Sequence, residues 1–214
     1  MDYRSTRALD LLLSSLDPGA KDQVLASLGR EVERIRAMPA GPSRARWLHE
    51  RVEAALAQFS AQQPEVISQV RCHRGCAHCC RLWVGVTRDE AELLAELAAT
   101  GAAAPDLDRM ALQQDWHSPM DFLGKPPEQA ACVFLGPDGA CTVYADRPSI
   151  CRAYLVASDP ELCRGGVEGA EIRSVVNPYV EILVAAALTV DAEADPPPRY
   201  GRHLSAALAA AQAD

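Results

Sequence analysis

The amino-acid sequence predicts a mainly α-helical protein, with a helical N-terminal arm and C-terminal helices around an irregular cysteine-rich centre that contains a short β-hairpin. Only 5% of the 214 residues are aromatic, whereas Ala and Leu are abundant, so the core must be built from aliphatic helix faces. Apolar residues recur at helical spacing near both ends of the chain. All eight cysteines lie between Cys72 and Cys163, which places the irregular centre in mid-sequence.

Residues 1–64 predict three amphipathic helices, because apolar side chains recur there at spacings of three and four. The stripes are Leu9, Leu12, Leu13 and Leu16; Val24, Leu28, Val32 and Ile35; and Leu48, Val52, Ala55 and Phe59. Turn-forming residues at 17–19 and 38–42 separate the helices, and such short connections imply antiparallel neighbours. No catalytic constellation occurs here, so we interpret the segment as a helical scaffold or a docking arm for a protein partner.

Residues 65–170 form the middle segment, which is less regular. Residues 82–86 predict a short strand. A helix follows, because Thr87 and Glu90 have the spacing of a capping box and Gly101 can end the helix. Residues 101–131 contain four prolines and no clear periodicity, so they predict an irregular connection, and a loop of that length is usually functional.

Residues 171–214 predict two further helices. Asn177 can cap the first helix, which Pro178 opens and which runs to about Val190. Three consecutive prolines at 196–198 break it, and an Ala-rich helix follows. We expect these helices to pack on the middle segment.

The net charge limits the kinds of partner that the protein can bind. The formal net charge is −8 and the pI is about 5.1, without a basic arm, so nucleic-acid binding is not expected. The first residues show no secretion signal, and the longest apolar run, residues 182–190, is too short to span a bilayer. We therefore expect a soluble, cytoplasmic protein without membrane contact. In a reducing cytosol, clustered cysteines indicate metal binding or redox chemistry rather than a disulfide framework.

The first four cysteines, Cys72, Cys76, Cys79 and Cys80, lie within nine residues. Ligands two to four residues apart let the backbone wrap around a metal ion, and Gly75 allows a tight turn. The first three cysteines meet this spacing. The adjacent Cys79 and Cys80 would point to opposite sides of an extended segment, so they could serve two separate sites.

The second group contains four widely spaced cysteines, Cys132, Cys141, Cys151 and Cys163. Residues 136–139 predict a turn between short strands at 132–135 and 141–144. In such a hairpin Cys132 and Cys141 would lie about 10 Å apart. We therefore do not expect these two thiols to share one ion.

Arginines accompany the cysteines. Pro148 predicts the start of a helix with Cys151 in its first turn, where the helix dipole and flanking arginines favour the thiolate form. A zinc ion bound by four thiolates leaves a net negative charge. Arg147 and Arg152 are therefore candidates to offset this charge and to donate hydrogen bonds to sulfur around the bound cofactor.

Other side chains near the cysteines in the sequence have less support as functional residues. His73 and His78 could each replace a thiolate, although eight sulfur atoms already suffice for two closed sites. Trp83, Phe134 and Tyr144 are interpreted as a small apolar pack beside the cysteines. The sequence has no glycine-rich phosphate loop, no Ser-His-Asp order and no HExxH motif, so it indicates neither a nucleotide-binding protein nor a hydrolase.

The cysteine pattern resembles that of the YkgJ-type cysteine-cluster family. The resemblance rests on the first four cysteines, on Cys-Val-Phe-Leu at 132–135, on the run from Cys-Thr-Val-Tyr at 141–144 to Arg-Pro-Ser-Ile-Cys-Arg at 147–152, and on the late Cys163. That family is described as a zinc- or iron-chelating domain. The resemblance therefore implies metal chelation by the cysteines, without specifying a reaction.

We predict a metal-binding protein without catalytic activity, in which thiolate-bound zinc or iron ties the irregular middle segment to the helices. Zinc is the first choice, because a structural zinc site can stabilise a loop-rich segment. The alternative is an iron–sulfur protein with redox or methyl-transfer activity. Thiolates bind zinc ions as well as iron–sulfur clusters, and flagellin lysine N-methylase has a similar cysteine pattern. Thiol–disulfide exchange by Cys79 and Cys80 has the least support, because a vicinal disulfide closes a strained ring.

Overall fold

The computed structural model describes residues 6–122, 124–164, 172–194 and 202–213, and these ranges are mainly helical, as predicted. The α-helices are α1 Arg7–Ser15, α2 Pro18–Arg36, α3 Pro42–Gln62, α4 Pro64–Ile67, α5 Arg88–Ala99, α6 Leu107–Gln113, α7 Pro127–Ala130, α8 Ser149–Ala153, α9 Pro178–Ala194 and α10 Leu204–Ala213. The 3₁₀ helices are η1 Cys79–Arg81, η2 Pro119–Phe122 and η3 Pro160–Arg164. The strands are β1 Gly85–Val86, β2 Leu155–Val156, β3 Ser174–Val175 and β4 Arg202–His203.

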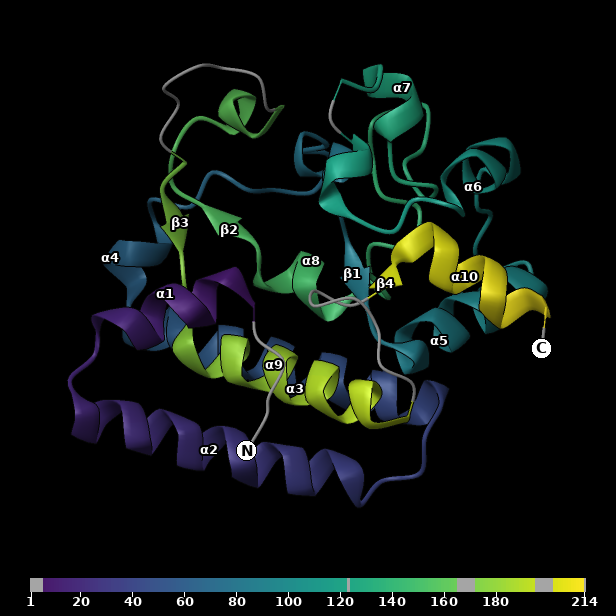
Figure 1. The fold of residues 1–214 in the computed structure, drawn as a ribbon. Coiled ribbons are helices and arrows are strands. Elements are labelled where there is room, and N and C mark those ends of the chain that lie inside the picture. Colours follow the sequence, from purple (N-terminus) through teal and green to yellow (C-terminus); the bar gives the residue numbers. More distant parts are fainter. Residues whose placement is uncertain (1–5, 123, 165–171, 195–201, 214) are drawn as a thin grey trace.

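Helices α1, α2, α3 and α9 form the lower layer in Figure 1. The three predicted apolar stripes of the arm face inward, and their central side chains are buried against α9. Every residue from Val180 to Val190 is buried, because α9 packs against α2, α3 and α1. The predicted cap is confirmed, since Asn177 Oδ1 accepts the N–H groups of Tyr179 at 3.0 Å and Val180 at 3.3 Å. The first core therefore joins the N-terminal helices to α9.

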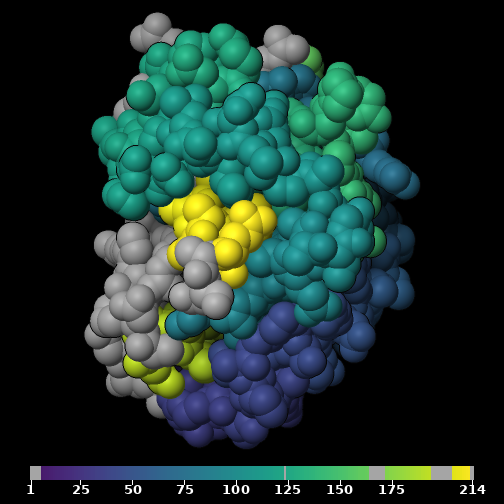
Figure 2. All heavy atoms as spheres, turned by 90° about the vertical axis from the view of Figure 1, so that its right-hand side faces the viewer, coloured from purple at the N-terminus to yellow at the C-terminus, as the bar shows by residue number. Residues whose placement is uncertain are grey.

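A second core lies between α5, α10 and the cysteine-rich segments. Its buried side chains include Val86, Leu94, Phe134 and Leu208. Strands β1 and β4 pair antiparallel, with Gly85 opposite His203, and this pairing leads directly into α10. Figure 2 shows α10, in yellow, between teal segments of the chain, in agreement with its packing against α5 and α6.

Helix α5 begins with the predicted capping box. The Thr87 hydroxyl accepts the N–H of Glu90 at 3.2 Å, and the Glu90 carboxylate accepts the N–H of Thr87 at 3.1 Å. The helix ends before Gly101, which has a φ of 74°. Residues 82–86 contribute only the two-residue strand β1.

The prediction of an irregular connection over residues 101–131 is wrong for three stretches, which form α6, η2 and α7. Asp106 caps α6 by accepting the N–H of Arg109 at 2.9 Å. The buried Gln113 then donates to the carbonyl groups of Gln129 at 2.6 Å and Ala131 at 2.8 Å. These helices have seven residues or fewer and are too short to produce a visible apolar period.

The predicted hairpin is reduced to a tight reversal. Gly139 N donates to Gly136 O at 3.0 Å, as a turn requires, but Leu135 and Cys141 form one isolated bridge in place of two regular strands. The reason is local, because Leu135 N donates to Cys132 O and Asp146 N to Val143 O, which curls both arms into turns. The curled arms keep their cysteines near the second core.

The division of the chain into residues 1–64, 65–170 and 171–214 stays a prediction. Packing crosses these boundaries, since α9 completes the core of the arm whereas α10 packs against α5 and α6 of the middle segment. Within the described ranges, no helix combines the length and the apolar composition needed to cross a membrane.

Candidate metal centre

The structure leaves all eight cysteines free of disulfides. Cys163 is buried, and the other seven are partly exposed. Four of the eight cysteines belong to short helices, Cys79 and Cys80 to η1, Cys151 to α8 and Cys163 to η3. Helix α8 and the β2–β3 pair lie above the lower helical layer in Figure 1. The mutual interactions of the cysteines divide six of them into two sets of three, with Cys79 and Cys80 linked to both sets.

The first set consists of Cys132, Cys141 and Cys151. All three pack against the second hydrophobic core, and each interacts electrostatically with the other two. The Cys132 and Cys141 sulfur atoms also accept the N–H groups of Phe134 and Val143. Cys132 and Cys141 were not expected to share an ion, yet the curled arms bring both thiols within electrostatic reach of Cys151.

The second set consists of Cys72, Cys76 and Cys163, which also interact electrostatically. Val156 of β2 donates its N–H to Cys72 Sγ at 3.3 Å, and the Tyr154 hydroxyl is hydrogen-bonded to Cys163. The tight turn predicted before Cys76 is confirmed. Gly75 adopts a φ of 90°, and Cys76 N donates to the carbonyl of residue 73 at 3.0 Å. A strand and a turn thus hold this set together.

The vicinal pair Cys79 and Cys80 is linked to both sets. It belongs to the 3₁₀ helix η1 rather than to the extended segment that the sequence argument assumed. Cys79 interacts electrostatically with members of both sets and is hydrogen-bonded to Cys80. The carbonyl of Cys80 accepts the N–H of Cys132 at 2.7 Å, and η1 packs against η3, which carries Cys163.

The thiols do not form a ready coordination shell. Among the residues that the structure describes, no group of three or more Cys, His, Asp and Glu side chains is arranged to hold a metal ion. The two sets are therefore defined by packing, hydrogen bonds and electrostatic interaction.

The environment of six thiols, those of Cys72, Cys79, Cys132, Cys141, Cys151 and Cys163, favours their neutral form. Burial raises the pKa of Cys132 to about 12 and raises that of Cys151 well above its ordinary value, and repulsion between neighbouring sulfur atoms acts in the same direction. The expectation that a helix start favours the Cys151 thiolate is thus wrong, because α8 has only five residues and Cys151 is packed against the core. Holding several of these groups as thiolates requires a compensating positive charge, and a thiolate-bound cation supplies it.

Arg147 supplies part of the positive charge that thiolates in this region require. Its guanidinium lies 3.9 Å from the centroid of the Tyr144 ring, and Arg74 lies over the same ring at 5.7 Å. Arg147 acts to lower the pKa of Cys79 and Cys141. Its buried Nε has no hydrogen-bond acceptor among the described residues. The sulfur atoms of a metal–thiolate site accept hydrogen bonds. The Arg147 Nε–H group is a buried donor of the kind that such a site requires.

Arg152 lies elsewhere. Its buried guanidinium donates to Glu53, to the carbonyl groups of Arg147 at 2.8 Å and of Ala145, and lies 3.5 Å from His49 Nδ1. The nitrogen atoms of Arg152 therefore contact oxygen atoms and the His49 ring rather than sulfur. Arg152 therefore holds the backbone that carries Arg147.

Sequence reasoning missed the buried pair of His49 and Glu90. His49 Nε2 lies 3.1 Å from Glu90 Oε1, and the same oxygen accepts the N–H of Ser149 at 2.6 Å. Ser149 begins α8, the helix of Cys151, so this pair ties α3 and α5 to the candidate site. No sequence signal could have joined His49 to Glu90, because they are 41 positions apart on different helices.

The Glu90 carboxylate makes the unfolding free energy of the protein depend on pH in the acid range. Burial opposes its ionisation, but the His49 ring and the N–H groups of Ser149 and Thr87 outweigh burial and hold the pKa of Glu90 below its ordinary value of 4.5. Its stabilising contribution is therefore complete above about pH 4.5 and is lost as the pH falls through the lowered folded-state pKa. We expect the difference in unfolding free energy between the natural protein and Glu90→Gln to shrink below pH 4.5, in urea titrations at several pH values. A difference that stays constant down to acid pH would contradict this account.

The other candidate side chains have contacts of their own. His78 Nε2 lies 3.3 Å from Glu161, and His73 Nδ1 lies 3.0 Å from the carbonyl of Arg71. In the part of the chain that the structure describes, no ring contact joins Trp83, Phe134 and Tyr144 to one another. Trp83 contacts Phe122 edge-on with ring centroids 6.2 Å apart, Phe134 is in the second core, and Tyr144 lies beneath the two arginines.

Comparison with known families supports a metal-binding role for the middle segment. Residues 71–168, slightly less than half of the chain, match the model of the CxxCxxCC family, described as "Putative zinc- or iron-chelating domain". The matched range contains all eight cysteines, although this chain has three residues rather than two between Cys72 and Cys76. Neither a curated protein nor a solved structure matches the chain significantly.

Proposed function

We propose that the middle segment is a non-catalytic zinc-binding module with two sites of four thiolates each. The observation that carries the proposal is the division of six cysteines into two sets of three, with Cys79 of the vicinal pair interacting electrostatically with members of both sets. One member of the pair completes each set, and three thiols plus one give the closed coordination of a structural zinc site.

Backbone contacts support a structural rather than a catalytic role. The first set joins α8 to the reversal at 132–144, and the second set joins the turn before Cys76 to β2 and η3. Zinc, when bound, would cross-link these short elements. Arg147 would donate to a metal-bound sulfur and offset negative charge. Since the role needs reduced thiols, we place the protein in the cytoplasm.

The arm has a separate proposed role. Helices α1, α2 and α3 share their core with α9 and contain no cysteine. We keep the proposal that the outer faces of these helices dock a protein partner.

Zinc stoichiometry tests the division into two sites. Cys151→Ser and Cys163→Ser belong to different sets, so we expect each variant to retain about half of the zinc of the natural protein and the double variant to retain almost none. Elemental analysis of protein purified without chelators measures this. Cys151→Ser combined with Cys141→Ser is the matched control, because both changes fall in one set and half of the zinc should remain. Loss of all zinc in either single variant, or no loss in the double variant, would contradict the assignment.

An iron–sulfur protein with redox or methyl-transfer activity is the second candidate, favoured by the iron in the family description and by the all-thiolate donor set. Anaerobic purification separates the two. A brown protein containing iron and acid-labile sulfide supports the cluster, whereas a colourless protein containing zinc supports the structural module.

A further inference from the structure

A second feature of the molecule lies between the arm and the middle segment. A cleft with a volume of about 750 Å³ opens between α1, α8 and the β2–β3 pair. Its walls are mainly apolar and include Leu11, Leu12, Ile150, Val175 and Val176. The volume lies within the range of about 300–1,000 Å³ that is usual for sites of small ligands.

Both lips of the cleft expose large apolar side chains. Leu11 on α1 is 61% exposed, and Ile172 beside β3 is 38% exposed. They are two of the five large hydrophobic residues that the described part of the chain leaves exposed. Large apolar side chains gathered around a hollow are typical of a surface that is covered when a ligand binds.

The polar group of the cleft is a buried carboxyl. Glu181 on α9 lines the cleft and is only 6% exposed. Among the described residues, the Thr6 hydroxyl is its one side-chain partner, donating to Oε2. Burial raises the pKa of Glu181, and the only basic lining residue is Arg7, whose side chain is exposed. Within the described ranges, no hydrogen bond to the second carboxyl oxygen, Oε1, is present.

We propose that this cleft binds a small aliphatic primary amine, with its hydrocarbon part between Leu11 and Ile172 and its ammonium group at Glu181 Oε1. An ammonium offers three hydrogen-bond donors and a charge opposite to that of a carboxylate. The apolar walls would exclude water from the hydrocarbon part of the ligand. Ile150, Ala153 and Tyr154 form one wall, so the ligand would also contact the helix that carries Cys151.

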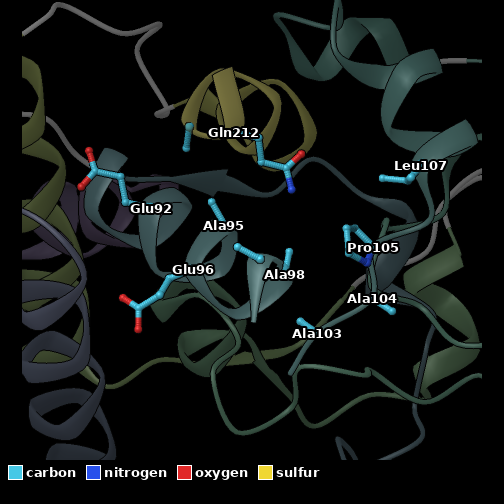
Figure 3. A pocket seen from close by; sticks show the side chains of 11 residues that line it. Glu92, Ala95, Glu96, Ala98, Ala103, Ala104, Pro105, Leu107 and Gln212 are labelled. Carbon is cyan, nitrogen blue, oxygen red and sulfur yellow. The ribbon is translucent and has the colours of Figure 1, made fainter. Parts of the chain in front are cut away.

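Another hollow of comparable volume has no buried carboxyl in its lining. It lies between α5, α10 and residues 103–107, and most of its lining is alanine. Figure 3 shows the carboxylates of Glu92 and Glu96 directed away from the alanine side chains. Both are already paired, Glu92 with Arg88 at 2.9 Å and Glu96 with Arg46 at 2.8 Å. Glu96 therefore provides a matched control.

Calorimetric titration of the full-length, metal-loaded protein tests the proposal with three probes of equal length, hexylamine, hexanol and hexanoate. We expect hexylamine to bind, hexanol to bind more weakly and hexanoate not to bind. Glu181→Gln removes the charge but keeps the shape, so it should weaken hexylamine binding by about tenfold or more. Glu96→Gln should leave binding unchanged.

A further variant separates binding from folding. Leu11→Ser alters an exposed lip without touching Glu181, and it should weaken hexylamine and hexanol equally. No binding of hexylamine at millimolar concentration, equal affinity for the three probes, or unchanged affinity in a folded Glu181→Gln variant would each overturn the proposal. None of these outcomes depends on the identity of the metal.

Discussion

Removal of the bound metal is expected to unfold the cysteine-rich segment, residues 71–164, while α1, α2, α3 and α9 remain helical. The segment relies on two-residue strands and helices of three to seven residues apart from α5, so its own secondary structure contributes little stability. A structural zinc site contributes an apparent free energy of about 10–16 kcal/mol, comparable with the whole stability of a domain. The first core contains no cysteine and joins the arm directly to α9.

Hydrogen exchange measured before and after treatment with a zinc chelator checks this expectation segment by segment. We expect backbone amides of α8 and of residues 132–144 to lose their protection, and those of α2 and α9 to keep it. The loss of helical circular dichroism should be only partial. Unchanged protection of the cysteine segment after verified metal removal would contradict the structural role of the metal.

Replacement of Glu90 by Ala is expected to cause the largest loss of stability among single changes outside the cysteines. The carboxylate is 2% exposed and accepts hydrogen bonds from the His49 ring, from Ser149 N–H and from Thr87. Truncation leaves these buried donors without an acceptor, which costs about 3–5 kcal/mol when a buried ionic partner is removed. The substitution should weaken the contact between α5 and α8.

Urea unfolding of the metal-loaded protein measures the effect. Glu90→Gln keeps the shape and one acceptor oxygen, so it should be less destabilising than Glu90→Ala. Glu96→Ala on the exposed face of the same helix should change the unfolding free energy by no more than about 0.5 kcal/mol. Equal effects of Glu90→Ala and Glu96→Ala would show that the buried network does not support the fold.

Long helices were predictable from the sequence because their apolar period repeats over several turns. The stripes of α1, α2 and α3, the capping box at Thr87 and the cap at Asn177 are all present in the structure. The short helices α6 and α7 were missed, since a single turn shows no period and four prolines in the region indicated a loop.

The candidate site was predictable as a list of residues but not as an arrangement. The spacing of the first cysteines indicated a metal-binding loop, and the turn at Gly75 is present. The two sets of three combine thiols that lie far apart in sequence, such as Cys72 with Cys163. Arg147 and Arg152 both lie within four residues of Cys151 in the sequence. Arg147 acts electrostatically on Cys79 and Cys141, whereas Arg152 is held by Glu53, His49 and backbone carbonyl groups.

By itself, the sequence determined the helical class, the positions of the long helices and the cysteine content of the middle segment, because periodicity and ligand spacing are local properties of a chain. Only the tertiary structure decided which thiols interact with one another, which arginine acts on them, and that His49, Glu90 and Glu181 are buried. Those features depend on contacts between residues that are distant in sequence, and such contacts arise only when the helices pack.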